Sequence, residues 1–276
     1  MTQRSDLASA FRALHIPGTP LVLPNAWDAV SARLVEEAGA AAVATTSAGL
    51  VWALGAADGE RVGRDAALAA VARIANTVSV PVTADIESGY AEDAEGVADT
   101  VRAVLDAGAV GVNIEDARYG AGADGPLRDV AEQAERITAV REAADAAGVP
   151  LFVNARIDTF LCGDGGVDPT LERAAAYRAA GADGILVPGA VDPGTVKELV
   201  TGVDGPLNVM AGPGAPPVAE LAALGVARIS VGSGIAQAAH AVVRRAAREL
   251  LDRGTYGGLA DALGYGEVNT LLTRVR

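Results

Sequence analysis

Lysine and cysteine are almost absent from this chain. Its 276 residues include one lysine, Lys197, and one cysteine, Cys162. A single cysteine excludes an internal disulfide and a zinc site built from several cysteines. Lys197 lies in V-K-E-L-V, which predicts a helix with its lysine in solvent. This argues against a Schiff-base aldolase, which needs a lysine inside its active site.

Long apolar runs are also missing. No segment is long and apolar enough to span a bilayer, and the first residues, M-T-Q-R-S-D-L-A-S-A-F-R, lack the apolar stretch of a signal peptide. We therefore expect a cytoplasmic protein. The two histidines, His15 before the first expected strand and His240 in a late helix, are not placed as general bases, and we expect both to be structural.

Positive charge is scarce, and the formal net charge is −13. This argues against nucleic acids and anionic membranes as partners. The same field repels anionic substrates at a distance. An acid substrate would therefore need local compensation by a metal ion or by arginine.

Proline and glycine alternate along the chain in a regular order. Each precedes a short and nearly all-apolar run, first a proline and then a glycine, four times over: Pro20, Gly39, Pro81, Gly108, Pro150, Gly181, Pro206 and Gly225. Proline is tolerated at the first residue of a strand, and glycine ends the preceding helix with a positive φ. Such apolar runs are typical of parallel strands buried on both faces. Segments rich in Ala, Arg and Glu lie between them and predict helices.

Eight strands alternating with helices over about 250 residues predict a (β/α)8 TIM barrel. The alternative, a doubly wound open sheet, should have two edge strands of different character, and no run differs in this way. We expect residues 1–276 to form one barrel domain with a C-terminal helical extension from about residue 252. The extension ends in the apolar V-N-T-L-L, which predicts a short extra helix.

Acidic side chains follow three neighbouring strands of the expected barrel. The third strand ends in D-I-E, with Asp85 and Glu87, which alternation along a strand would point the same way. The fourth ends in V-N-I-E-D, with Glu115, and the fifth in V-N-A-R-I-D, with Arg156. Crowded carboxylates repel unless a proton or cation joins them, and oxygen ligands suit Mg²⁺ or Mn²⁺. The alternatives are helix caps or an exposed strand end at Asp85 and Glu87, and a structural ring of salt bridges.

The remaining strand ends carry weaker signals. The second strand ends in T-T-S-A-G, which either offers backbone N–H groups and hydroxyls to a carboxylate or forms a plain loop. Asp28, after the first strand, is expected to cap the next helix. The loops A-G-P-G and V-G-S-G, after the last two strands, suggest a phosphate site, although barrel closure also requires small residues there.

One glycine motif is not interpreted as a nucleotide site. Gly120, Gly122 and Gly125 form G-x-G-x-x-G, but a dinucleotide site needs these glycines to lead straight from a strand into a helix. Here Glu115–Tyr119 intervene and Pro126 follows. We interpret residues 116–127 as a lid over the site.

Taken in order, these segments resemble the isocitrate lyase and phosphoenolpyruvate mutase superfamily. The resemblance runs from Leu21 to about Leu251 and rests on P-N-A-W-D-A-V-S-A-R, T-S-A-G-L ahead of Asp58, D-I-E-S-G-Y, V-N-I-E-D and N-A-R-I-D. It implies a (β/α)8 barrel whose last helix is exchanged between subunits, giving a homodimer or homotetramer. It also implies Mg²⁺, or Mn²⁺ in its place, and a 2-oxo or enol carboxylate substrate.

The resemblance implies a set of metal ligands. Asp85 matches the direct ligand, and Asp58, Glu87 and Glu115 match ligands that act through water. Glu87 stands where many members have aspartate, so its longer side chain could reach the metal directly.

The resemblance also implies substrate contacts. Thr46, Ser47 and Ala48 match the segment that holds the substrate carboxylate, and Arg156 matches the arginine that balances substrate charge. Asn208, at the end of the seventh strand, is a further candidate for substrate contact.

The lid departs from the pattern of the superfamily. Its lyases carry K-[KR]-C-G-H and its mutases K-x-N, but this chain has A-R-Y-G-A-G-A-D-G-P. Cys162 follows the fifth strand and therefore does not correspond to the lyase cysteine. We do not expect isocitrate or methylisocitrate cleavage, nor the phosphonate rearrangement.

These observations lead to one expected function. We expect a Mg²⁺-dependent lyase or decarboxylase that breaks a C–C bond of a small 2-oxo (di)carboxylate through an enolate, with Arg156, Glu115 and Tyr119 as catalytic residues. The proton donor stays open between a metal-bound water, Tyr119 and Asp116. The alternatives are an enzyme acting on a C–P or C–O bond of a phosphonopyruvate-type substrate, and a non-catalytic protein that binds 2-oxo acids.

Overall fold

Parallel strands surround a common axis, and the first of them is interrupted. The computed structural model describes residues 3–119, 126–162 and 165–273. Pro24 divides the first strand into β1 (Leu21–Leu23) and β2 (Asn25–Ala26). The strands that follow are β3 (Val43–Thr45), β4 (Val82–Asp85), β5 (Gly111–Glu115), β6 (Phe152–Arg156), β7 (Gly184–Leu186), β8 (Leu207–Met210) and β9 (Arg228–Ser230).

The interrupted first strand closes the barrel. β1 pairs with β9 and β2 pairs with β3, and every pairing in the sheet is parallel. The amide of Asn25 spans the junction, because its nitrogen donates to the carbonyl of Thr45 at 2.9 Å and its oxygen accepts from the backbone N–H of Val231 at 3.0 Å. The predicted (β/α)8 barrel is confirmed, and the open doubly wound sheet is excluded, because the two strands at the ends of the sheet order, β1 and β2, are consecutive halves of one interrupted strand.

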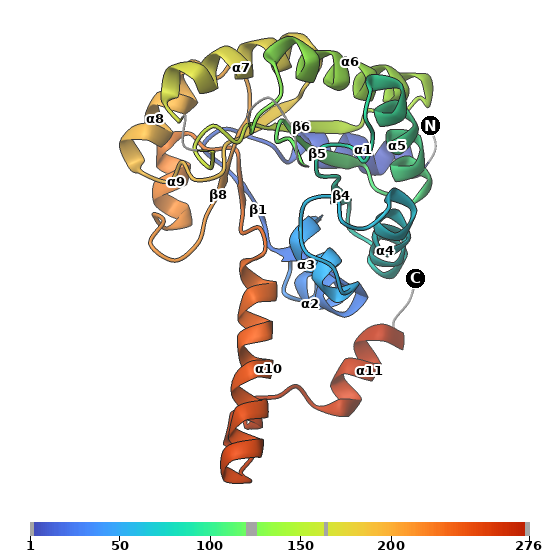
Figure 1. Cartoon of the computed structure of the whole chain (residues 1–276), viewed down its shortest axis with the longest axis vertical. Coiled ribbons are helices and arrows are strands. Elements are labelled where there is room, and N and C mark those ends of the chain that lie inside the picture. The colour runs from blue at the N-terminus through green and yellow to red at the C-terminus, as the bar shows by residue number, and fades with distance from the viewer. Residues whose placement is uncertain (1–2, 120–125, 163–164, 274–276) are drawn as a thin grey trace.

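Helices connect the strands and cover most of the barrel (Figure 1). They are α1 (Gln3–Ala13), α2 (Ala29–Glu37), α3 (Ser47–Ala53), α4 (Arg64–Thr77), α5 (Ala94–Asp106), α6 (Val130–Ala146), α7 (Val167–Ala179), α8 (Pro193–Gly202), α9 (Val218–Leu224), α10 (Gly234–Arg253) and α11 (Tyr265–Thr273), with a 3₁₀ helix at Gly257–Leu259. Among the helices of the described residues, none combines the length and the apolar character needed to cross a membrane.

The proline and glycine pattern marks the elements as predicted. β1, β4 and β8 begin one residue after a proline, and β6 begins two residues after Pro150. The four glycines that were expected to end helices have φ values of 93°, 94°, 107° and 101°: Gly39, Gly108, Gly181 and Gly225. Asp28 caps α2 in a capping box with Ser31, also as predicted.

The N-terminal end of the barrel is plugged by side chains from α1 and from the loop after it. Phe11 meets the start of β5 so closely that a Cβ on Gly111 would lie 2.6 Å from the Phe11 ring. The ring of His15 stacks on Phe152, with ring centroids 3.7 Å apart. Burial, followed by the charge of Arg228, lowers the pKa of His15 to about 3. His15 is therefore a neutral core residue, while His240 on α10 contacts Trp52.

The barrel interior above this plug is polar. Asn154 donates to the amide oxygens of Asn113 at 3.0 Å and Asn208 at 3.1 Å, and Arg228 donates to Asn113 at 3.1 Å. Arg228 is only 1% exposed. Burial lowers its pKa to about 9, and the charge of Asp85 opposes this effect. A buried cation therefore lies beneath the C-terminal mouth of the barrel, where aliphatic layers are usual.

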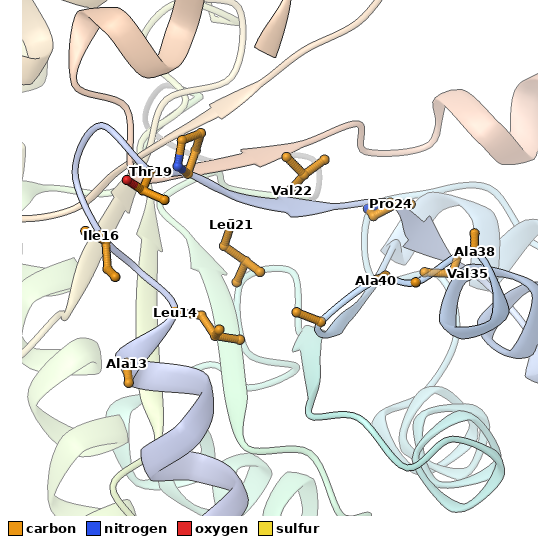
Figure 2. A pocket seen from close by; sticks show the side chains of 13 residues that line it. Ala13, Leu14, Ile16, Thr19, Leu21, Val22, Pro24, Val35, Ala38 and Ala40 are labelled. Carbon is orange, nitrogen blue, oxygen red and sulfur yellow. The ribbon is translucent and has the colours of Figure 1, made fainter. Parts of the chain in front are cut away.

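Apolar surface is left open at two places, along α10 and beside β1. Ala236 is the one buried residue of α10, and this helix extends away from the barrel (Figure 1). The last helix, α11, returns to α2 of the same chain, where Arg33 donates to the carbonyl of Leu271 at 3.0 Å. A cavity of about 510 Å³ lies between the end of α2, β1 and the loop before it (Figure 2). Ile16 and Val22 line this cavity and are 52% and 42% exposed.

Several polar atoms of the interior lack protein partners within the described residues, among them Thr83 Oγ1 and Arg228 Nε. Buried polar atoms are normally hydrogen-bonded to protein or to ordered water. We therefore expect Thr83→Val, which keeps the shape of the side chain, to lower the free energy of unfolding by about 1 kcal/mol. Urea denaturation measures this effect.

The matched control for that substitution is Thr100→Val. Thr100 is equally buried, but its hydroxyl donates to the carbonyls of Gly89 and Gly96 at 2.8 Å and 3.1 Å. We expect removal of this hydroxyl to lower the free energy of unfolding by a similar amount. A rise in stability for Thr83→Val alone would show that its hydroxyl is unpaired in a dry interior.

Candidate active site

The predicted acidic residues gather at the C-terminal ends of β4, β5 and β6. Asp85 ends β4 opposite Asn113, and Glu115 ends β5 opposite Arg156. Glu87 and Glu115 are each 1% exposed, whereas Asp85 is half-buried and faces the mouth of the barrel. The structure therefore brings these side chains into one neighbourhood, on the barrel end where TIM barrels carry out chemistry.

Glu87 reaches this neighbourhood by a route that strand alternation does not describe. β4 ends at Asp85, and Glu87 has a φ of 50°, in the left-handed region. The sequence argument from a shared strand face is therefore wrong for Glu87. Instead, a turn brings Glu87 back, and its backbone N–H donates to Asp85 Oδ1 at 3.2 Å. Its carboxylate accepts hydrogen bonds from the Tyr90 hydroxyl at 2.9 Å and from the backbone N–H of Glu60.

Arg156 is the cation of the site. Its Nη1 lies 2.5 Å from Glu115 Oε2, and its Nε lies 2.6 Å from Asp158 Oδ1. Burial lowers the pKa of this guanidinium, but the carboxylates of Glu115, Asp158 and Asp85 outweigh that effect and raise it. Arg156 is therefore a permanent positive charge held between acids.

The carboxylates exceed what Arg156 can neutralise. Burial raises the pKa of Asp85, and Arg156 opposes the shift. Burial also raises the pKa of Glu115 well above its ordinary value, and the charges of Asp158, Asp85 and Glu87 add to the shift. The pKa of Glu87 rises to about 7, again mainly through burial. Such a cluster favours the uptake of a cation or of protons.

Asp85 has the least occupied carboxylate of the cluster. Its Oδ1 accepts the long bond from Glu87 N–H, its Oδ2 accepts from the Ser47 hydroxyl at 3.3 Å, and the Ser47 backbone N–H also stabilises this carboxylate. Its backbone N–H donates to the Thr45 hydroxyl at 2.8 Å, which holds the end of β4 against β3. Among the described residues, no three His, Cys, Asp or Glu side chains are grouped closely enough to bind one metal ion together. The donor set still suits Mg²⁺, because this ion binds few carboxylates and keeps several waters.

The small-residue segment after β3 is the start of a helix, not a loop. Thr46 is the N-cap of α3 and Ser47 is its first residue. Both Thr46 and Ser47 are buried, and the Ser47 hydroxyl contacts Asp85. The segment Thr46–Ala48 therefore borders the acid cluster through Ser47, and its contact with a substrate stays a prediction.

Three other candidates have distinct surroundings. The Asp58 side chain is exposed and adds negative charge near Asp85 and Glu87. The amide of Asn208 lies below the mouth and is occupied by bonds to Asn154, Ser230 and backbone carbonyls. Asp116 points out of the barrel, where it accepts hydrogen bonds from Arg173 and Tyr177.

Only part of the predicted lid can be compared with the structure. Residues 120–125, which include the three glycines of the G-x-G-x-x-G motif, lie outside the described residues. At the base of the segment, Ala117 pairs with Leu127 in an antiparallel bridge. The Tyr119 hydroxyl there donates to Glu115 Oε1, so Tyr119 contacts the acid cluster directly.

Sequence reasoning missed three residues around the site. Glu60 contacts Glu87 from the loop between α3 and α4, and Tyr90 contacts it from three residues further along the same turn; only a three-dimensional structure shows these contacts. Arg228 does leave a signal in the sequence. It is a charged residue inside the mostly apolar run V-A-R-I-S-V, and fully buried arginines are rare unless they are paired.

The fold and site together define an acid-lined (β/α)8 barrel with one arginine among carboxylates at its C-terminal mouth. Residues 11–251 match the model of the phosphoenolpyruvate phosphomutase family. The chain belongs to this family, and the resemblance to the isocitrate lyase and phosphoenolpyruvate mutase superfamily is confirmed.

Individual relatives agree with this assignment. An uncharacterized protein of Mycobacterium tuberculosis (strain H37Rv) is 39% identical over 238 residues, which are 84% of this chain and 87% of that protein. The 2-methylisocitrate lyase of Escherichia coli K12 is 34% identical over 186 residues, which are 66% of this chain and 62% of the enzyme. A crystal structure of a Burkholderia cenocepacia J2315 protein superimposes with a TM-score of 0.90 at 40% identity, covering 97% of this chain and 95% of that chain.

Glu87 makes stability depend on pH with a definite sign. Its folded-state pKa of about 7 lies above the ordinary 4.5, so between these values the folded protein binds more protons than the unfolded chain. The stabilisation that proton binding by Glu87 provides is complete below about pH 4.5 and is lost as the pH rises through about 7. In chelator-treated protein we expect Glu87→Gln, which cannot ionise, to gain about 2 kcal/mol over wild type between about pH 4.5 and pH 8.

Urea denaturation at the two pH values measures this gain. Glu142→Gln, on the exposed surface of α6, is the control and should show the same difference from wild type at both. A Glu87→Gln difference that does not change with pH would mean that Glu87 is already ionised without cost.

Proposed function

We propose that the protein is a Mg²⁺-dependent lyase or decarboxylase that breaks a C–C bond in a small 2-oxo dicarboxylate. The observation that carries the proposal is the buried excess of carboxylates around the guanidinium of Arg156. Divalent cations remove such an excess, and Mg²⁺ prefers oxygen ligands. A related phosphonopyruvate hydrolase, 27% identical, is described in complex with oxalate and Mg²⁺.

The four acidic residues would hold the ion in two ways, directly or through water. Asp85 would be the direct ligand, because the hydrogen bonds that its carboxylate accepts from Glu87 N–H and from the Ser47 hydroxyl are long, at 3.2 Å and 3.3 Å. Asp58, Glu87 and Glu115 would act through water, because Glu87 and Glu115 already accept hydrogen bonds or ion pairs on both oxygens. When bound, Mg²⁺ supplies Lewis-acid polarisation of the substrate's 2-oxo group.

The remaining residues bind and orient the substrate. The first turn of α3, with Thr46, Ser47 and Ala48, offers hydroxyl and backbone N–H groups to the substrate carboxylate next to Asp85. Arg156 stands beside Glu115 and stabilises the negative charge that develops when the electron pair of the broken C–C bond moves into the 2-oxo group. Asn208 supports this arrangement from below through Asn154 and makes no direct contact in the proposal.

Protonation of the resulting enolate carbon is assigned to Tyr119. Its hydroxyl already donates to Glu115, so the pair holds a proton at the edge of the acid cluster. Asp116 is left out of this role because its carboxylate is turned toward Arg173 and Tyr177.

The names of several relatives support the substrate class. Oxaloacetate decarboxylase of Ectopseudomonas mendocina is 29% identical over 207 residues. A related oxaloacetate acetylhydrolase, 25% identical, is described in complex with the inhibitor 3,3-difluorooxalacetate. Oxaloacetate is therefore the first substrate to test, with phosphonopyruvate as the representative of C–P bond chemistry.

The assay compares both compounds with MgCl₂ and with EDTA. We expect Mg²⁺-dependent consumption of oxaloacetate and a loss of at least 100-fold in kcat/KM for Asp85→Asn, since a direct ligand is removed. Asp65→Asn, an exposed acid on α4, is the matched control and should retain full activity. Full activity of Asp85→Asn would contradict the proposal. Turnover of phosphonopyruvate alone would favour C–P chemistry, and binding without turnover would favour a non-catalytic binder.

We also propose that the protein is a dimer or tetramer in which α10 packs on a second copy. α10 carries exposed apolar side chains, with Val243 at 65% and Leu250 at 49% exposure, and it leaves the barrel that it would otherwise cover. The cavity beside β1 is correspondingly open to an apolar partner (Figure 2). Exchange of α10 between two copies would bury both surfaces.

Light scattering after gel filtration tests the assembly. Wild type should elute as a multiple of 27.6 kDa, and the double substitution Val243→Glu, Leu250→Glu should yield monomers, because burying two carboxylates is costly. Tyr265→Glu, on the exposed face of α11, should leave the assembly unchanged. A monomeric wild type would refute the exchange.

A further inference from the structure

An unusual backbone geometry surrounds Glu87. Within the described residues, the non-glycine residues with positive φ are Glu60, Glu87 and Tyr90, at 55°, 50° and 52°. Side chains with a Cβ rarely adopt this region, so surrounding contacts must hold each residue there. All three belong to one hydrogen-bonded group, although Glu60 is 27 positions away from Glu87 in the chain. Strained backbone that persists in this way typically marks functional sites.

Glu60 makes the contacts that join the group. Its backbone N–H donates to Glu87 Oε2. Its own carboxylate oxygen Oε1 accepts two hydrogen bonds of 2.8 Å, one from the Ser88 hydroxyl and one from the backbone N–H of Tyr90. The Tyr90 hydroxyl then donates to Glu87 Oε1 at 2.9 Å. Glu60 therefore holds the turn Glu87–Tyr90 at two points, because its backbone N–H binds the Glu87 side chain and its own side chain binds Ser88 and Tyr90. These contacts together are the grip of Glu60 on the turn.

The loop that carries Glu60 also contains Asp58, and it approaches Glu115 through Tyr119. Asp58 lies two residues before Glu60, so the contacts of Glu60 restrict where the Asp58 backbone can lie. Between them, Gly59 has a φ of 96°, and a Cβ on it would lie 3.0 Å from the Tyr119 ring. Tyr119 is hydrogen-bonded to Glu115. The segment Asp58–Glu60 is therefore held between the turn that carries Glu87 and the tyrosine that contacts Glu115.

We propose that Glu60 is a positioning residue that places Asp58 and Glu87 for the cation held by Asp85. The effect of Glu60 on cation binding rests on the proposed function, whereas its hydrogen bonds to the turn do not rest on it. Glu60 does not contact the cation in this account, because its Oε1 is already engaged by the Ser88 hydroxyl and the Tyr90 backbone N–H, in the turn after Glu87. The length of a glutamate side chain is required at this position, because its carboxylate must reach Ser88 and Tyr90 while the Glu60 backbone N–H stays hydrogen-bonded to the Glu87 carboxylate.

Amide hydrogen exchange tests the grip without reference to any metal. In wild type, the N–H groups of Glu60 and Tyr90 are hydrogen-bonded to carboxylates and should exchange slowly. We expect Glu60→Ala to raise the exchange rate of the residue 90 amide at least about tenfold, whereas Glu60→Gln keeps it within about threefold, because the amide oxygen still accepts both bonds. Glu92→Ala, an exposed neighbour, is the control.

Calorimetric titration with MnCl₂ tests the consequence for the site. Removal of a group that orients metal ligands typically weakens binding about 10- to 100-fold, so we expect Glu60→Ala to weaken Mn²⁺ binding by at least about tenfold and Glu60→Gln to restore most of it. If Glu60→Ala does not fold, Glu60→Asp, which is shorter by one methylene, should show the faster exchange and weaker binding instead.

The outcomes separate the two proposals. Unchanged exchange at residue 90 in Glu60→Ala would overturn the role of Glu60, whatever the metal does. Faster exchange at residue 90 with unchanged Mn²⁺ affinity would also overturn it, because the hydrogen bonds of Glu60 would then not contribute to cation binding. A wild type that does not bind Mn²⁺ would refute the proposed function and, with it, the consequence assigned to Glu60, while the exchange data would still decide whether the grip exists.

Discussion

The burial of several neighbouring carboxylates is the constraint around which this structure is organised. Asp85, Glu87 and Glu115 all have raised pKa values because burial penalises their charged forms. Arg156 is the one guanidinium that ion-pairs with this group among the described residues, and it is shared with Asp158. Native proteins are stable by only about 5–15 kcal/mol, so a cluster that costs free energy of folding is kept for a reason other than stability. Function at the mouth of the barrel is that reason in our account.

The rest of the barrel supports this cluster from several sides. Beneath it, Arg228 and a ladder of asparagines replace the usual aliphatic layers, so that the mouth rests on a cationic and hydrogen-bonded floor. Beside it, the turn at Glu87 is held in a strained conformation by Glu60 and Tyr90. Below the floor, Phe11, His15 and Phe152 close the N-terminal end. Preorganised charge of this kind is what enzymes use to stabilise charge that develops during a reaction.

Local chemistry explains why so much of the fold could be predicted from the sequence. Proline before strands, glycine after helices and the cap at Asp28 each act through the backbone of a few neighbouring residues, and the structure has all of them. The split of the first strand follows from Pro24, which lacks an N–H for the sheet, but the sequence does not say that both halves pair on different sides.

The candidate site was predictable only in part, because its details depend on contacts between distant segments. Asp85, Glu115 and Arg156 end strands, so their placement follows from strand order. Glu87 does not follow from alternation, because its position depends on a left-handed turn and on Glu60, 27 residues earlier. Asn208 was a reasonable candidate for substrate contact by position, yet its amide is occupied by the interior network.

The central claim is that one divalent cation at Asp85 relieves the excess of negative charge. The most direct test is anomalous diffraction from crystals soaked in MnCl₂ at about pH 7.5. The account predicts one manganese peak within about 2.3 Å of an Asp85 carboxylate oxygen, with waters linking it to Glu87 and Glu115. A mouth without such a peak, or a manganese ion bound only elsewhere, would contradict it.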